Sequence, residues 1–275
     1  MAELKKVLLR PGDELQILDS QPRDGFYQVQ TEDGDEGWVA ARNISIKEQP
    51  PELAPPPGNL APANRIDETW LKPEPKKTTF DGTTRACPWN GDDSDPGTFI
   101  FKNRADTPLS YHDVTWDAIA TLEYPVDKPL RKNWTPDHRA ELARYEGIPL
   151  RAVGYLVAYK PQAHGSGEGT NCHMNQATET DTHLALVKEA GDAEKGSVVI
   201  EFTPRFLKAH PNWNKKALAN WINTENPVRI SGWLMFDPDH RNHLKRFRST
   251  LWEIHPITRI EVWKDNSWVD LDTAK

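Results

Sequence analysis

Ionisable side chains recur at alternate positions in several apolar stretches of this sequence. Asp181 and His183 are two residues apart, as are Glu253 and His255, and Glu201 stands between two large apolar residues. Residues i and i+2 of a β-strand project to the same face. Burying such groups without partners is costly. We therefore expect these side chains to contact one another, a metal ion or a ligand.

Imidazoles and carboxylates from separate segments are the ligands that zinc, manganese and iron use in proteins. The candidate metal ligands are His173, His183, Glu201, Asp237, His240 and His255. The candidate catalytic residues are Glu253, Asp181, Arg205 and Arg248. In this interpretation Glu253 is a general acid/base or orients a ligand, and the two arginines stabilise developing charge. The expected cofactor is a divalent metal, zinc or manganese.

Two alternatives need no metal. In the first, the carboxylates orient His183 and His255 through hydrogen bonds or pair with arginines, and the network only specifies the fold. In the second, the polar face binds a ligand without catalysing a reaction. The sequence alone leaves all three interpretations open.

Two polar loops adjoin the candidate strands. Residues 161–180 form a long connection, and a loop of that length without secondary structure is usually functional or disordered. The loop after Asp237 carries Arg241, Lys245, Arg246 and Arg248 with no acidic residue among them. Such a local positive field favours an anionic substrate such as a phosphodiester. Alternatively, these cations pair with the acidic segment 81–148.

The first 46 residues alternate short β-rich runs with turn signals, which predicts a small barrel of short strands that includes residues 7–9. An aromatic-x-V strand, a DG turn and a closing GWV strand lie at residues 26–29, 24–25 and 37–39. This pattern resembles the bacterial SH3-like domain. The resemblance implies a peptide or protein partner, for which Trp38 is either a binding residue or a packing residue.

Five β-rich segments follow in the C-terminal half, at residues 149–160, 182–189, 197–204, 227–236 and 250–263. Between the third and the fourth, residues 212–223 show the apolar spacing of a helix. Three strands, a helix and two strands is the order of an OB-fold barrel, which usually binds ligands on the face of strands 2 and 3. Nucleic acid or another anionic ligand is the partner that this face predicts.

The expected domains are an SH3-like domain at 1–48, a proline-rich linker at 49–80, and an OB-like domain at 81–275. The last comprises an N-terminal extension (81–148) and a barrel core (149–270). The predicted fold class is mainly β: a small SH3-like barrel plus an OB-like five-stranded barrel, with one inserted helix and an irregular extension. Within the extension, Thr135 as N-cap, Pro136 and a stop at Gly147 predict a helix.

Composition excludes several classes of protein. The net charge of -7 argues against general coating of nucleic acid. No apolar run is long enough to span a bilayer, and the first ten residues lack the apolar core of a signal peptide, so we expect a cytoplasmic protein without a membrane partner. A chain that has lost its leader would look the same. The two cysteines, Cys87 and Cys172, are bonded, metal-binding or inert.

Five short blocks recur across the candidate site. They are NCH at 171–173, D-x-H at 181–183, E-x-T-P-R at 201–205, GW-x-x-x-D-x-x-H at 232–240 and W-E-I-H-P at 252–256. Together they resemble a family of uncharacterised bacterial proteins over residues 103–272. That resemblance implies one domain and supplies no reaction.

The residues therefore predict a metal-dependent hydrolase acting on a phosphodiester or similar anionic substrate, through a cluster of histidines and carboxylates on the barrel face. The alternative function is a non-catalytic OB-fold module that binds nucleic acid, peptide or glycan. In that alternative the SH3-like domain recruits a partner.

Overall fold

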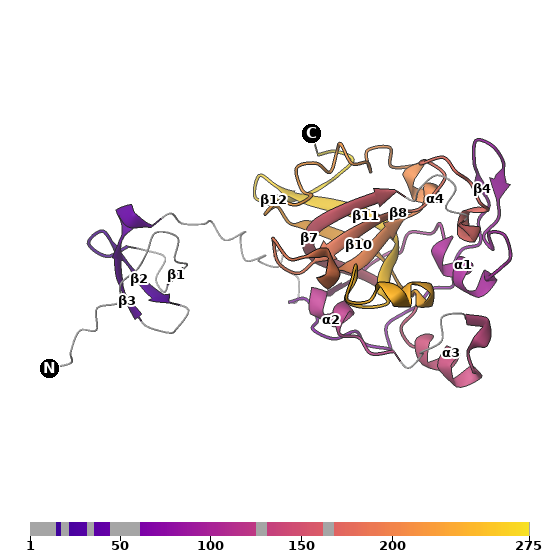
Figure 1. Ribbon diagram of the computed structural model, residues 1–275, viewed down its shortest axis with the longest axis horizontal. Helices are drawn as coiled ribbons and strands as arrows, with labels where there is room; N and C mark the ends of the chain where they lie inside the picture. The colour runs from indigo at the N-terminus through magenta and orange to yellow at the C-terminus, as the bar shows by residue number, and fades with distance from the viewer. Residues whose placement is uncertain are drawn as a thin grey trace. The chain divides into compact units, whose positions relative to one another are not determined.

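The computed structural model describes residues 15–17, 22–31, 36–44, 61–124, 131–161 and 168–274 (Figure 1). The chain divides into two compact units, Met1–Glu52 and Leu53–Lys275. Among the described residues, no helix is long and apolar enough to cross a membrane.

The first unit contains a three-stranded antiparallel sheet. Strands β1 (Leu15–Ile17), β2 (Phe26–Thr31) and β3 (Glu36–Ala40) lie in the order β1-β2-β3. The DG turn precedes β2, and positive φ at Asp24 and Gly25 provides the tight reversal. A 3-10 turn, η1 (Ala41–Asn43), follows β3. The strand predicted at residues 7–9 lies outside the described residues.

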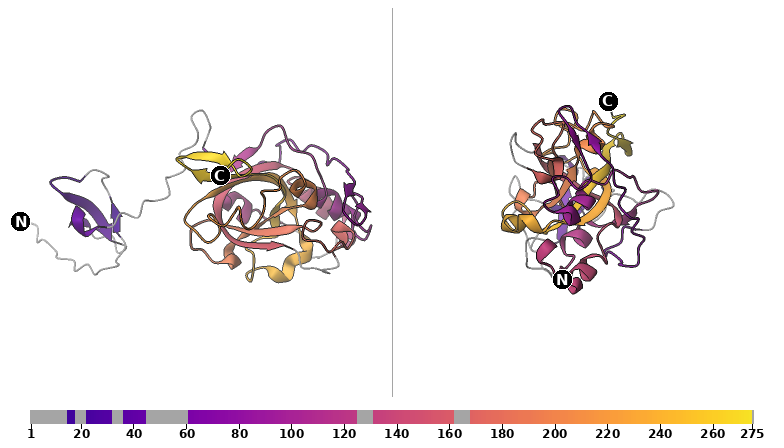
Figure 2. Two further views of the ribbon diagram at one scale, coloured as in Figure 1. Left: turned by 90° about the horizontal axis from the view of Figure 1, so that it is seen from above. Right: turned by 90° about the vertical axis from the view of Figure 1, so that its right-hand side faces the viewer.

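The second unit is built on a closed barrel (Figure 2). Its strands are β7 (Pro149–Pro161), β8 (Thr182–Val187), β9 (Val198–Phe202), β10 (Val228–Phe236) and β11 (Trp252–Lys264). They pair in the order β7-β8-β9-β11-β10, and β10 closes the ring against β7. Only the β9–β11 pairing within this ring is parallel. The predicted mainly β fold with a five-stranded barrel is confirmed.

The two faces of the barrel strands differ in chemistry. Leu184, Ile200 and Ile254 belong to the hydrophobic core. His183 and Glu201 occupy neighbouring positions on the opposite face, where they pair across β8 and β9. Because side chains alternate along a strand, the apolar set fills the barrel and the ionisable set projects away from its core. The candidate site therefore lies on the outer face.

The extension supplies the elements that cover this barrel. They are β4 (Phe80–Asp81), β5 (Ala86–Cys87), α1 (Pro96–Lys102), β6 (His112–Val114), α2 (Trp116–Ala120), η2 (Arg131–Asn133) and α3 (Pro136–Leu142). α1 packs against β11, and α2 packs against β7, β9 and β11. The helix predicted after Thr135 is α3, and the Thr135 hydroxyl accepts a hydrogen bond from the His138 backbone N–H at its start.

Part of the predicted linker packs on this second unit. Ile66 is buried in the main hydrophobic core. Ala63 forms an isolated parallel bridge with Val114 of β6, and the Trp70 ring stacks on the His112 ring at 4.0 Å. Residues 61–80 thus contact the barrel domain, whereas 45–60 lie outside the described residues.

The segment between β9 and β10 corrects a prediction. The helix found there is α4 (Pro204–Leu207), and residues 212–223 form successive turns. Trp213, Leu218 and Trp221 are buried as a helical stripe would be. The Asn214 side-chain oxygen accepts a hydrogen bond from the Ala217 backbone N–H, as an N-cap does, but the turns that follow do not form a regular helix. The remaining elements are η3 (Gly169–Asn171), η4 (Glu194–Gly196), η5 (Pro238–His243) and β12 (Ser267–Asp270).

Candidate metal centre

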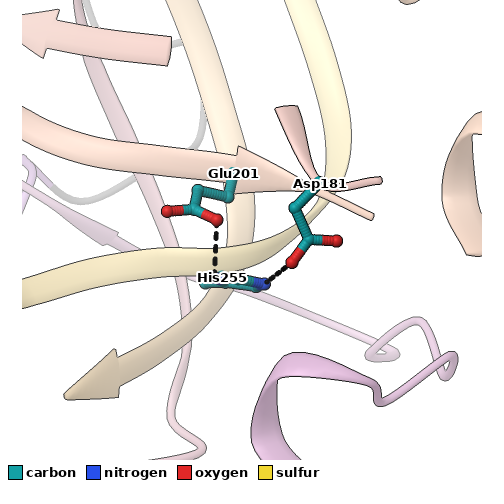
Figure 3. A group of neighbouring side chains, drawn as sticks. All are labelled: Asp181, Glu201 and His255. Atoms are coloured by element: carbon teal, nitrogen blue, oxygen red, sulfur yellow. Dashed lines mark ion pairs between the residues drawn. The ribbon is translucent and has the colours of Figure 1, made fainter. Parts of the chain in front are cut away.

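Three strands bring together one histidine and two carboxylates from distant parts of the chain. Asp181 directly precedes β8, Glu201 lies near the end of β9, and His255 lies near the start of β11. The parallel pairing of β9 with β11 places Glu253 opposite Val199, so His255 follows toward Glu201. Figure 3 shows the three side chains pointing toward one another.

The geometry of this group suits a single divalent ion. His255 Nδ1 lies 3.3 Å from Glu201 Oε2, and His255 Nε2 lies 3.5 Å from Asp181 Oδ2. One ligand atom from each residue lies within 4.8 Å of the other two. Two atoms bound at about 2.1 Å to the same ion are at most about 4.2 Å apart. A small closing movement would therefore allow all three residues to bind one ion.

Burial removes this group from water, so its charges need partners within the protein or a bound ion. Asp181, Glu201 and His255 each have 0% exposure. Within the described part of the chain, Asp181 Oδ2, Glu201 Oε2 and His255 Nε2 make no hydrogen bond. Neither carboxylate has a lysine or arginine within ion-pair distance among the described residues. The negative charge must be balanced by protonated histidines or by a bound cation.

A second group of possible ligands adjoins the first through Glu253. Asp237, His240 and Glu253 also offer ligand atoms within 4.8 Å of one another, and Glu253 Oε2 lies 3.4 Å from His255 Nδ1. The carboxylates of this second group already pair with an arginine and a lysine. Arg248 Nη2 lies 2.5 Å from Glu253 Oε1, and Lys102 Nζ lies 3.8 Å from Asp237 Oδ2. Because these charges are balanced by protein groups, the first group is the stronger candidate for a metal site.

The pKa shifts follow from this crowding. Burial alone would lower the pKa of His255, but Glu201, Asp181 and Glu253 raise it to about 10. Burial alone would raise the pKa of Glu201, but His183 and His255 hold it well below its usual range. The three carboxylates that keep the His255 ring protonated would also attract a metal ion, which would take the place of the proton.

A cavity of about 290 Å³ lies beside the cluster, and its wall includes His183, His240 and Arg248. His183 Nε2 lies 2.5 Å from Glu201 Oε1, and its side chain is 21% exposed. The Asp237 carboxylate accepts a hydrogen bond from His240, whose side chain is also partly exposed. These two imidazoles connect the buried carboxylates to the cavity.

Several residues of the cluster were not selected from the sequence. Lys102 ends α1, and Asn171 Nδ2 donates to Glu168 Oε2 at 3.0 Å and to Asp181 Oδ1 at 3.1 Å. Burial, with Asp181 adding to it, raises the pKa of Glu168 to about 7. Lys102 lies in the extension, and no local pattern marks it. Asn171 directly precedes Cys172 and His173, so the NCH block marks it in the sequence.

Two of the sequence-selected residues lie apart from these groups. His173 is half-exposed, with Nε2 2.8 Å from Asp92 Oδ2. Arg205 Nη1 donates to Asn103 Oδ1 at 2.6 Å, and Nη2 lies 3.3 Å from the Cys87 carbonyl oxygen. Arg205 therefore ties α4, which follows β9, to the extension. The structure brings together the other selected residues: Asp181, His183, Glu201, Asp237, His240, Arg248, Glu253 and His255.

A disulfide bond joins Cys87 to Cys172. It links β5 of the extension to the loop that carries Glu168 and Asn171, next to the candidate metal centre. Disulfides persist mainly in oxidising compartments. The bond therefore counts against the cytoplasmic location expected from the sequence.

Removing this bond should destabilise the protein. Replacement of both cysteines by alanine is expected to lower the free energy of unfolding by about 2–4 kcal/mol, because a cross-link restricts the unfolded chain. The two cysteines are separated by 85 positions in the sequence. Urea unfolding of the double variant, and of the unmodified protein with and without a reductant, measures the effect. An unfolding midpoint that is the same in all these samples would contradict the prediction.

Comparisons with known proteins identify only part of the chain. Residues 8–45 match the family model of the bacterial SH3 domain, which confirms the resemblance seen in the first unit. A segment of 87 residues is 30% identical to growth arrest-specific protein 7 of Homo sapiens, covering 30% of this chain and 18% of that protein. No solved structure matches. The resemblance based on the five short blocks stays a prediction.

Proposed function

We propose that the second unit is a divalent-metal-dependent hydrolase for a phosphodiester or a similar anionic substrate. The observation that carries this proposal is the group of Asp181, Glu201 and His255. All three residues have 0% exposure, and they offer ligand atoms within 4.8 Å of one another. Among the described residues, neither of the two carboxylates pairs with a lysine or an arginine. Two carboxylates and one imidazole suit zinc or manganese.

The surroundings of this group support hydrolysis. Asp181, Glu201 and His255 would hold a divalent ion, which would supply Lewis-acid chemistry at this site. His183 and His240 stand between the buried carboxylates and the cavity, at positions where an imidazole can accept or donate a proton. Arg248 lines the same wall, and its guanidinium, which pairs with Glu253, would also face a developing oxyanion in the cavity.

Metal content and hydrolysis test the proposal together. The full chain, purified without a histidine tag, is expected to contain close to one zinc or manganese ion. It should hydrolyse bis(p-nitrophenyl) phosphate in a chelator-sensitive manner. His255→Ala should lose the metal and at least 100-fold in turnover, about 3 kcal/mol in transition-state stabilisation. Elemental analysis and initial rates are the measurements.

His173→Ala is the matched control, because His173 is a half-exposed histidine that lies outside the cluster. It should retain metal and turnover. Circular dichroism of both variants checks that the barrel remains folded. An unmodified protein that takes up no metal after incubation with zinc and manganese would overturn the proposal.

A second candidate function is a non-catalytic binding module, as predicted for an OB-like barrel with an SH3-like domain. Phe26 and Trp38 are 45% and 51% exposed, and the β2–β3 register places them on the same face of the sheet. Two exposed aromatic rings on one face favour a peptide or protein partner for the first unit. Ligand binding at the barrel that persists in chelator, without turnover, would favour this function.

A further inference from the structure

The cavity beside the candidate metal centre has an apolar floor. Ala158, Ala185 and Val199 line it and face one another across three neighbouring strands, because Ala158 pairs with Ala185 and Ala185 pairs with Val199. Small side chains in register leave a flat patch on the outer face of the sheet. A planar group can lie on such a patch with little loss of contact.

The next row of the same face is polar. Lys160 pairs with His183, and His183 pairs with Glu201. Two residues along a strand correspond to about 6.6 Å. The cavity therefore changes from apolar to ionisable over roughly the distance that separates an aromatic ring from a phosphate in a nucleotide.

Aromatic rings form the wall above this floor. The His240 and His243 ring centroids are 4.9 Å apart, and the His243 and Phe247 centroids are 5.4 Å apart. Phe247 is 41% exposed, so its ring is available at the cavity rim. Lys160 Nζ lies 5.3 Å from the Phe247 centroid, although Lys160 also pairs with Glu194. An exposed ring beside a cation is a suitable surface for stacking a base or an aryl group.

We propose that this cavity binds a phosphate ester that carries a planar aromatic group, such as a mononucleotide. The ring lies between the Phe247 side chain and the floor of Ala158, Ala185 and Val199. The phosphate points toward His183, His240 and Arg248. The cavity of about 290 Å³ accommodates one such unit rather than a longer strand. This inference rests on the proposed function for its substrate class, but the binding it describes requires no turnover.

Calorimetric titration of the full chain with thymidine 5′-monophosphate tests the inference, in manganese and separately in chelator. In manganese the nucleotide should bind at least tenfold more tightly than thymidine or inorganic phosphate, because only the nucleotide contacts both halves of the cavity. Phe247→Ala should weaken nucleotide binding about tenfold through lost stacking, and Phe247→Trp should preserve it. Phenyl phosphate distinguishes a plain aryl ester from a nucleotide as the preferred member of the class.

Leu109→Ala is the control variant, because Leu109 is an exposed apolar residue that does not line the cavity. It should bind the nucleotide as the unmodified protein does. Nucleotide binding that depends on Phe247 in a protein without hydrolytic activity would support the inference and overturn only the proposed function. Equal binding by Phe247→Ala and the unmodified protein, or no binding of thymidine 5′-monophosphate, would overturn the inference even if a diester is hydrolysed.

Discussion

Replacement of Arg248 by methionine is expected to lower the free energy of unfolding by about 3–5 kcal/mol in the absence of metal. Arg248 is 2% exposed, and its Nη2 lies 2.5 Å from Glu253 Oε1. Its Nη1 lies 3.7 Å from Asp237 Oδ2, and its Nε donates to the Thr250 carbonyl oxygen at 2.8 Å. Methionine fills a similar space but leaves the fully buried Glu253 carboxylate without its arginine partner, and it removes one of the cations near the buried Asp237 carboxylate.

Urea unfolding at neutral pH in chelator measures this loss. Arg246→Met is the matched control, because Arg246 is exposed and lies in the same loop. Its effect should stay within about 0.5 kcal/mol. Adding Glu253→Gln to Arg248→Met should recover part of the stability, because it removes one unbalanced charge. If Arg248→Met costs no more than Arg246→Met, the arginine does not balance the cluster.

The barrel was predictable because its signal is local. All five strands alternate apolar and polar residues or run through apolar stretches, and each one lies where the sequence places it. The same alternation selects Glu201, Glu253 and His255. Once each strand is identified, the side of the sheet that a residue faces follows from its position.

The turns at 212–223 show where this reasoning fails. Trp213, Leu218 and Trp221 have the spacing of a helix, and they are buried as a helix would bury them. Irregular turns that satisfy the same burial leave the same trace in the sequence. Apolar spacing predicts which side chains enter the core, but it does not determine the backbone that carries them there.

Contacts with the extension explain why the sequence did not predict Lys102 as part of the site and included His173, which lies outside it. Lys102 contacts Asp237 although the two are far apart in sequence, and nothing around Lys102 indicates that pairing. The sequence selects His173 because it is an imidazole in the loop that leads into β8. In the structure Cys172 and His173 both have positive φ, and the turn directs His173 toward Asp92. Tertiary contacts place Lys102 in the site, and an unusual backbone conformation turns His173 away from it. The spacing of residue types along the sequence indicates neither of these features.

A second large effect is expected from pH. In chelator, the free energy of unfolding should fall by up to about 5 kcal/mol as the pH rises from 6.5 to 10, which follows from the pKa of His255 alone. Glu201, Asp181 and Glu253 raise that pKa to about 10 from the ordinary value of 6.5. The folded protein then holds a proton that the unfolded chain has released. The stabilisation is fully present below pH 6.5 and is lost as the pH passes through about 10.

Other groups in the cluster set the limits of this pH range. The pKa of Glu168 is raised to about 7 by burial, so its ionisation above pH 4.5 also costs stability. His183 and His255 hold the pKa of Glu201 well below its ordinary range. Lys102 and His240 do the same for the pKa of Asp237. Their contribution is present above the ordinary carboxyl pKa and is lost in acid. Stability without metal should therefore be greatest near pH 4.5 and should fall above it, first through Glu168 and then through His255.

The bound metal should change this dependence, because a ligating imidazole is neutral and has no such proton to lose. With saturating zinc or manganese, the fall above pH 6.5 that is due to His255 should disappear. A metal-free hydrogen-bonded network instead predicts the same fall with and without added ions. Unfolding curves between pH 6 and 9 in both conditions separate the two cases. His255→Gln provides the reference, because it removes the titrating ring and should flatten the fall in chelator.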